Sequence, residues 1–140
     1  MTGQPISMHT ALIYLMIVVA GSDRSMSDNE LKRIGRLVQD LPVFAGFNIE
    51  YLIPTARDCG SILDAEEGLT TVLGIIRESV PEEACETAYC LACDVAAADD
   101  HLGRFERSIL DTVRATLGIE RLAAAAIERA AAARWWRPAR

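Results

Sequence analysis

The amino-acid sequence predicts an all-α protein, folded as one compact bundle of about seven helices. Hydrophobic residues make up 51% of the 140 residues but aromatic residues only 6%, a composition typical of packed helices. Apolar residues recur three and four positions apart through most of the chain, which is the period of an amphipathic helix. No segment alternates polar and apolar residues for long enough to predict a strand.

The chain begins with an unusually apolar predicted helix. Residues 8–21 are apolar on every side, so we expect them to form the buried central helix of the bundle. Ser27 is a typical N-cap for a second helix over 28–41, whose apolar residues follow the amphipathic spacing. The link 42–47 opens with a proline that stops this helix, and we expect its two phenylalanines to fill part of the core.

Five more helices follow in the remainder of the chain. A third is predicted over 48–65 after an asparagine cap, and a fourth over 67–79. Pro81 then opens a fifth helix, because proline is favoured at the first helical position. A sixth is predicted over 104–117 and stops at a glycine, and an alanine-rich seventh covers 119–134.

An eight-residue pattern occurs twice, each time where an apolar helix should end. Asp23 and Glu30 enclose the first copy, and Asp99 and Glu106 enclose the second. In both copies two residues, one apolar residue and three further residues separate Asp from Glu. The flanking helices share apolar positions at the same offset, so the sequence predicts an internal duplication of helix, acidic turn and helix. A rough two-fold axis between the copies would bring the four carboxylates together.

Two interpretations of these carboxylates are open. Like charges gathered in one place favour a divalent cation, and oxygen ligands favour Ca²⁺, Mg²⁺ or Mn²⁺ over Zn²⁺. Helix capping is the alternative, because Glu30 and Glu106 fall in first helical turns, where a carboxylate compensates the helix dipole. Capping does not explain Asp23 and Asp99, which follow a helix C-terminus where an anion is unfavourable. All four residues are therefore candidate metal ligands.

Two further side chains near the second turn are candidate ligands. Asp94 lies in the middle of the apolar fifth helix, where a carboxylate should bind metal or be paired. Its alternative role is an ion pair with an arginine such as Arg36 or Arg114. His101 lies inside the second turn and is either a metal ligand or an ordinary exposed histidine.

The cysteines are the last candidates for site chemistry. Cys90 and Cys93 have CxxC spacing, but they fall inside a helix without a second CxxC pair. We expect them to act as small core residues, with zinc binding or redox chemistry as the alternative. The sequence contains no Ser-His-Asp arrangement and no Gly-rich phosphate loop, so it predicts no enzymatic reaction.

The distribution of charge bears on partners and location. The net charge is −6, and all 20 acidic residues precede residue 129. Such an acidic body repels phosphate backbones, so nucleic acid is not an expected partner. The apolar run 11–21 is too short to span a bilayer and lacks the basic residues of a signal peptide, so we expect a cytoplasmic protein.

The C-terminal end has a different composition from the body. We expect a single helical domain over 1–134, followed by a basic tail over 135–140 that contains both tryptophans. Such a cluster suits the headgroup zone of the inner membrane face or a groove on a partner protein. The alternative is that one or both rings fold back over the bundle. The candidate contact residues are Trp135, Trp136, Arg134 and Arg137.

Nearly the whole chain resembles the TerB family of tellurite-resistance proteins. The segments that carry the likeness are residues 11–20, 23–30, 41–44, 87–99 and 117–122. The resemblance implies a duplicated helical bundle with an acidic, metal-binding surface in the bacterial cytoplasm, acting in tellurite resistance and stress response. It also implies calcium-binding and membrane-embedded partner proteins, and no defined enzymatic reaction. A helical scaffold without metal and a metal-assisted enzyme remain the alternatives.

Overall fold

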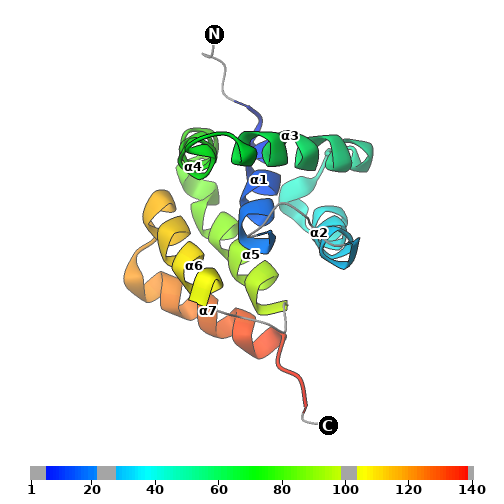
Figure 1. Cartoon of the computed structure of the whole chain (residues 1–140). Helices are drawn as coiled ribbons and strands as arrows, with labels where there is room; N and C mark the ends of the chain where they lie inside the picture. The colour runs from blue at the N-terminus through cyan, green and yellow to red at the C-terminus, as the bar shows by residue number, and fades with distance from the viewer. Residues whose placement is uncertain (1–5, 22–27, 99–103, 139–140) are drawn as a thin grey trace.

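The computed structural model describes residues 6–21, 28–98 and 104–138 of the chain. Within these ranges the protein is all-α, which confirms the fold class predicted from the sequence. The seven helices form one compact bundle (Figure 1), and they are α1 Met8–Ala20, α2 Asp28–Asp40, α3 Leu52–Asp64, α4 Gly68–Ser79, α5 Cys85–Ala98, α6 Arg104–Leu117 and α7 Arg121–Arg134. The short 3₁₀ turns between them are η1 Pro42–Phe44, η2 Ile49–Tyr51 and η3 Glu82–Ala84.

Helix α1 runs through the middle of the bundle, as its apolar sequence predicted (Figure 1). The Ser7 hydroxyl caps its N-terminus by accepting a hydrogen bond from the Thr10 amide at 3.1 Å. Every residue from Ala11 to Val19 is buried, and the helix packs against α3, α4 and α5. Because burial of a Val, Leu or Ile side chain contributes roughly 1.5–3 kcal/mol, α1 supplies a large part of the hydrophobic stabilisation.

Helix α5 is the second buried helix and lies between α1 and α7. Ala88, Ala92 and Ala96 are at most 3% exposed. Small side chains at these positions let the neighbouring helices approach α5 closely. Helix α7 and the segment that follows it therefore lie against α5, the helix that precedes the second acidic turn.

The link after α2 folds into the core, as its phenylalanines predicted. Phe44 is only 3% exposed, and Phe47 is partly buried against the same core. His9 lies between them, with its ring centroid 5.6 Å from each phenylalanine ring. Its Nε2 is also 2.9 Å from the carbonyl oxygen of Val43, so α1 holds this link in place.

The predicted helix boundaries differ from the observed ones mainly at N-termini. Asn48 caps the η2 turn by accepting a hydrogen bond from the Glu50 amide at 2.9 Å, and α3 follows directly. Pro81 is not the first residue of an α-helix, because it precedes the η3 turn and α5 begins only after that turn. Helix α7 begins two residues later than predicted, with Glu120 as its N-cap. Gly118 ends α6 with φ +71, the left-handed conformation that favours glycine there.

In the described part of the chain, no helix is both long and apolar enough to cross a membrane. The predicted duplication would relate α1 and α2 to α5 and α6. Both acidic turns lie outside the described residues, so their two-fold relationship remains a prediction.

Candidate functional site

The structure describes only some of the predicted metal ligands. Asp23, Asp99 and His101 lie outside the described residues. Glu106 belongs to α6, but its side chain is also outside the described part. Glu30 is described, and it lies in the first turn of α2. The geometry of the candidate site is therefore defined by Glu30 and by the helix ends that lead into the two turns.

These helix ends meet around one small pocket. The C-terminal turn of α1, the C-terminal half of α5 and the first two turns of α2 all contribute to it. Its lining residues are Val19, Ala20, Glu30, Arg33, Ile34, Val95 and Ala96. The two segments that precede the acidic turns are therefore neighbours in the folded chain, although they are far apart in the sequence.

The described groups around this pocket carry charge of both signs, because the N-terminus of α2 meets the C-termini of α1 and α5 here. Helices α1 and α5 both end here, and the carbonyl groups at a helix C-terminus carry partial negative charge. The Glu30 side chain adds a carboxylate at the pocket, while Arg33 contributes one positive charge. Carboxylate and carbonyl oxygens are the ligands that hard divalent cations prefer. Among the described residues alone, no group of three or more His, Cys, Asp or Glu side chains could hold a metal ion.

Asp94 makes an ion pair within the fold. Its Oδ1 atom accepts hydrogen bonds from Arg134 Nη1 at 2.5 Å and from Trp135 Nε1 at 3.2 Å. The Asp94 side chain is only 14% exposed, so these bonds compensate a largely buried charge. The pairing matches the structural role considered from the sequence, but the arginine is Arg134 rather than Arg36 or Arg114. This arrangement favours a structural role for Asp94 over metal binding.

The C-terminal tail folds back on the end of α5. Arg137 Nη2 donates a hydrogen bond to the carbonyl oxygen of Ala98 at 3.1 Å. Trp135 is partly buried and donates a hydrogen bond to Asp94, whereas Trp136 is 72% exposed. One tryptophan therefore covers the bundle and the other faces solvent. We call the contacts of Arg134, Trp135 and Arg137 with Asp94 and Ala98 the C-terminal clamp.

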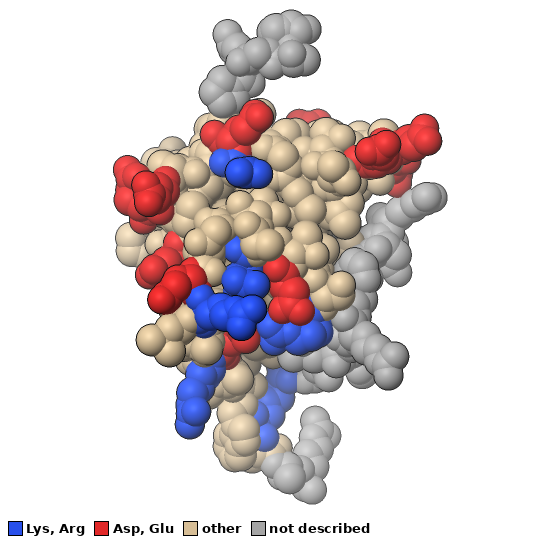
Figure 2. All heavy atoms as spheres, turned by 90° about the vertical axis from the view of Figure 1, so that its left-hand side faces the viewer, with Lys and Arg blue, Asp and Glu red and all other residues tan. Residues whose placement is uncertain are grey.

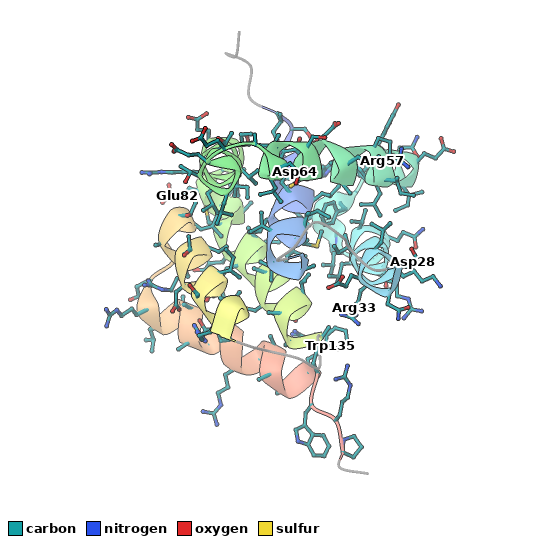
Figure 3. The ribbon with its side chains drawn as sticks, in the orientation of Figure 1. Asp28, Arg33, Arg57, Asp64, Glu82 and Trp135 are labelled. Atoms are coloured by element: carbon teal, nitrogen blue, oxygen red, sulfur yellow. The ribbon has the colours of Figure 1, made fainter. Side chains whose placement is uncertain are left out.

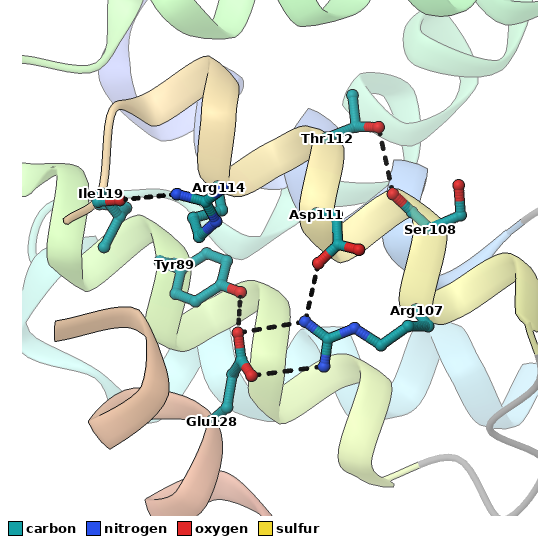
Figure 4. A network of polar contacts seen from close by, with 8 residues as sticks. All are labelled: Tyr89, Arg107, Ser108, Asp111, Thr112, Arg114, Ile119 and Glu128. Atoms are coloured by element: carbon teal, nitrogen blue, oxygen red, sulfur yellow. Dashed lines mark hydrogen bonds and ion pairs between the residues drawn. The ribbon is translucent and has the colours of Figure 1, made fainter. Parts of the chain in front are cut away.

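A second polar network joins α5, α6 and α7 (Figure 4). The Tyr89 hydroxyl donates a 2.5 Å hydrogen bond to Glu128 Oε2. Arg107 bridges the two carboxylates beside it, at 3.3 Å from Glu128 and 2.8 Å from Asp111. The network as a whole could not be predicted from the sequence, because its members come from three helices. Local spacing relates only Arg107 and Asp111, which are four residues apart on α6.

The two central groups of this network have pKa shifts in opposite directions. The pKa of Tyr89 is raised, first because the ring is buried and then because its hydroxyl donates to Glu128. Burial also acts to raise the pKa of Glu128, but the hydrogen bonds from Tyr89 and Arg107 outweigh it and lower this pKa. The network therefore holds a neutral phenol against an ionised carboxylate at neutral pH.

Replacing Glu128 with alanine should lower the free energy of unfolding by about 2 kcal/mol, since the fully buried Tyr89 hydroxyl would lose its acceptor. Glu128→Gln keeps an acceptor oxygen, so it should cost only about 1 kcal/mol. Urea unfolding followed by circular dichroism measures both values.

Because folding lowers the pKa of Glu128, the contribution of Glu128 to the free energy of unfolding is present above pH 4.5, its ordinary pKa. This contribution is lost as the pH falls through the folded-state pKa. Equal stabilities of Glu128→Ala and the unmodified protein at neutral pH would contradict this prediction.

The four cysteines are free thiols in different environments. Cys59 and Cys93 are buried, and burial raises the pKa of each thiol to about 12. Cys90 is exposed, so the two members of the CxxC pair do not face the same surroundings. Cys93 is therefore a core residue, as expected from the sequence, whereas the same expectation was wrong for Cys90. The buried thiols stay protonated at neutral pH, which disfavours metal or redox chemistry at Cys59 and Cys93.

Comparison with known proteins found one match. The family model described as "Tellurite resistance protein TerB" matches residues 9–129. No curated protein and no solved structure matches the chain. The matched segment includes the pocket at the helix ends and the Tyr89–Glu128 network, while Arg134, Trp135 and Arg137 of the C-terminal clamp follow it.

Proposed function

The chain belongs to the TerB family of tellurite-resistance proteins, and we propose that it is a divalent-cation-binding interaction module of this resistance system. In this proposal it acts in the bacterial cytoplasm during stress. A surface that depends on the bound cation binds other tellurite-resistance proteins, one of them embedded in the membrane. The chain catalyses no reaction of its own.

The observation that carries the proposal is the small pocket formed by the ends of α1 and α5 and the start of α2. Both predicted acidic turns follow helix ends in this region, and Glu30 supplies a carboxylate at the pocket. We propose that Glu30, Asp23, Asp99 and Glu106 hold the cation. A set made only of carboxylate oxygens favours Ca²⁺, Mg²⁺ or Mn²⁺ over Zn²⁺. Asp94 is left out of this set because it already pairs with Arg134.

The state of the buried titratable groups supports a non-enzymatic role. Cys59 and Cys93 stay protonated at neutral pH, and Tyr89 donates a hydrogen bond to a carboxylate that Arg107 also binds. A nucleophile or general base needs the opposite shift, toward a more reactive form near neutral pH. The described groups with the largest shifts therefore stabilise the fold and do not resemble catalytic groups.

Calorimetry and thermal unfolding with CaCl₂, MgCl₂ or MnCl₂ test the proposal. A cation at about one hundred times its Kd should stabilise the folded chain by about 2.7 kcal/mol. The Asp23→Asn/Asp99→Asn variant should lose most of this stabilisation and should be more stable than the unmodified protein without a cation, because repulsion is relieved. The matched control is Glu82→Gln/Glu83→Gln, which removes two charges at exposed positions before α5 and should bind the cation normally.

Two outcomes would contradict the proposal. One is the absence of both a binding heat and a rise in Tm with any of these ions or with Zn²⁺. The other is an equal loss of cation binding in the control variant, which would indicate a diffuse response to net charge. In either case the acidic turns are helix caps, and the chain is a helical scaffold.

A further inference from the structure

The outward side of α7 carries the two most exposed large hydrophobic side chains in the described part of the chain. Leu122 is 77% exposed and Trp136 is 72% exposed, compared with 61% for Tyr51 and 50% for Ile53. Leu122 lies in the first turn of α7, and Trp136 follows its last turn. At a rise of 1.5 Å per residue, Leu122 is roughly 18 Å along the helix axis from Arg134, the last residue before the two tryptophans.

The helical period explains why these side chains face outward. Ala124 and Ala131 are buried against the bundle, and Ile127 lies partly buried between them. Residues on the opposite side of the helix are exposed. We call this side the α7 outer face, and it consists of Leu122, Ala125, Ala126, Arg129, Ala133 and Trp136.

The charge near this face is positive. Arg121 and Arg129 are exposed on α7, and Arg137 is exposed just beyond it. The acidic residue within α7, Glu128, faces α5 and α6, where it binds Tyr89 and Arg107. An approaching surface therefore meets arginines together with two large apolar side chains.

Several exposed acidic groups lie at the end of the bundle opposite the C-terminal tail. Asp64 and Glu82 lie near α3 and α4, far from Trp135 at the lower end (Figure 3). The space-filling view shows acidic atoms over the upper part of the molecule and also beside the basic atoms midway down, while most basic atoms lie over the lower half (Figure 2). Although the net charge is −6, the exposed Arg121 and Arg129 give the α7 outer face a local positive charge that an anionic surface can meet.

We propose that the α7 outer face docks on an anionic lipid surface, a role that goes beyond the proposed cation site and does not depend on it. Arg121 and Arg129 bind lipid phosphates, while Leu122 and Trp136 insert among the headgroups. Leucine and tryptophan are suited to this zone, and arginine can extend from it to the phosphates. The helix lies in the plane of the membrane and does not cross it.

The position of Arg129 favours lipid over a second copy of the chain. A two-fold pairing of α7 helices that covers Leu122 with the partner's Trp136 brings both copies of Arg129 together at the centre. Two like charges there oppose such a pairing. Anionic phosphates instead pair with this arginine, so the same residue that disfavours a dimer favours the lipid surface.

Sedimentation with vesicles tests this inference on the full chain, in EDTA to exclude any effect of a cation. Vesicles of phosphatidylcholine mixed with phosphatidylglycerol should bind the protein, and pure phosphatidylcholine should bind it far more weakly. Arg129→Glu should weaken binding about twentyfold, since each charge near the surface contributes about fivefold and this change reverses one. Leu122→Ser/Trp136→Ser should also weaken binding. The matched controls are Arg57→Glu and Tyr51→Ser/Ile53→Ser, which change exposed residues on the η2–α3 segment.

Three results would overturn the inference. They are equal binding to both kinds of vesicle, no binding to either, and unchanged binding of the α7 variants under conditions where circular dichroism shows that they are folded. A concentration-dependent dimer that the same α7 substitutions abolish, without vesicle binding, would instead assign the face to self-association. Weaker binding in the α7 variants alone, reduced further by added salt, would support the lipid surface.

Discussion

Raising the pH from 8 to 11 should lower the free energy of unfolding by several kcal/mol. Below about pH 9 the thiols of Cys59 and Cys93 are protonated in both the folded and the unfolded chain, so they do not affect the equilibrium. Above that pH the unfolded chain releases these protons, whereas burial keeps the thiols neutral in the folded protein up to about pH 12. Alkali therefore favours the unfolded state.

The shifts set the size of this effect. A thiol whose pKa rises from 9.0 to about 12 on folding destabilises the folded state by about 2.7 kcal/mol at pH 11. Two such thiols give about 5 kcal/mol, and Tyr89, whose pKa is also raised, adds to the loss above pH 10. Natural domains are stable by roughly 5–15 kcal/mol, so the protein should be close to unfolding at pH 11.

Urea unfolding at a series of pH values measures this dependence. Cys59→Ala and Cys93→Ala should each be somewhat less stable at pH 7, because a small cavity forms, but each should remove about half of the alkaline loss. Cys90→Ala is the control, since its thiol is exposed and should change the alkaline loss much less. A free energy of unfolding that stays constant up to pH 11 would refute the assignment of these shifts.

Replacing Asp94 with alanine should lower the free energy of unfolding by about 2–4 kcal/mol. The change removes the acceptor for both Arg134 and Trp135, and it leaves the partly buried indole N–H without its partner. The first consequence is local, because the C-terminal clamp opens. The second is global, because α7 loses an anchor on α5, the helix with which it makes most of its contacts.

Tryptophan fluorescence separates these two consequences. Both tryptophans of the chain lie in the tail, so in a Trp136→Phe background the emission reports on Trp135 alone. Asp94→Ala should shift this emission to longer wavelength below the urea concentration at which the bundle unfolds. Asp111→Ala is the control, because it removes a more exposed Asp–Arg pair whose expected contribution is only about 0.5 kcal/mol. An emission spectrum that does not change in the Asp94 variant would contradict the existence of the clamp.

The helices were predictable because their signals are local. The apolar run of α1, the asparagine before η2 and the glycine after α6 each specify backbone geometry within a few residues. The start of α5 was predicted less well, because a proline suits an α-helix and a 3₁₀ turn equally at that point.

The partners of buried polar groups were not predictable in the same way. The sequence indicated that Asp94 needed a counterion, since it lies among alanines and cysteines. It could not identify Arg134, because the pairing depends on how α7 packs across α5. Tyr89 and Glu128 illustrate the same limit, since neither position is unusual until the two helices are placed together.

The candidate cation site was predictable only in part. The repeated pattern indicated that the two acidic turns belong together, and the helix ends that precede them do share a pocket. The ligand geometry, however, depends on how the side chains of Asp23, Asp99 and Glu106 are oriented. The spacing of residues in the sequence does not determine this orientation.

The buried position of α1 has a consequence for how the protein is made. Residues 8–20, a segment that is apolar on every side, are synthesised well before their partner α5, which begins at residue 85. At ordinary translation rates of about 5–20 residues per second, that delay is on the order of 10 s. Until α3, α4 and α5 have all been synthesised, the nascent chain displays part of the surface that later becomes its core, and we expect chaperones that cover this segment to raise the yield in a cell. A circular permutant that places α1 after α5 would shorten the exposure and should accumulate with less aggregation.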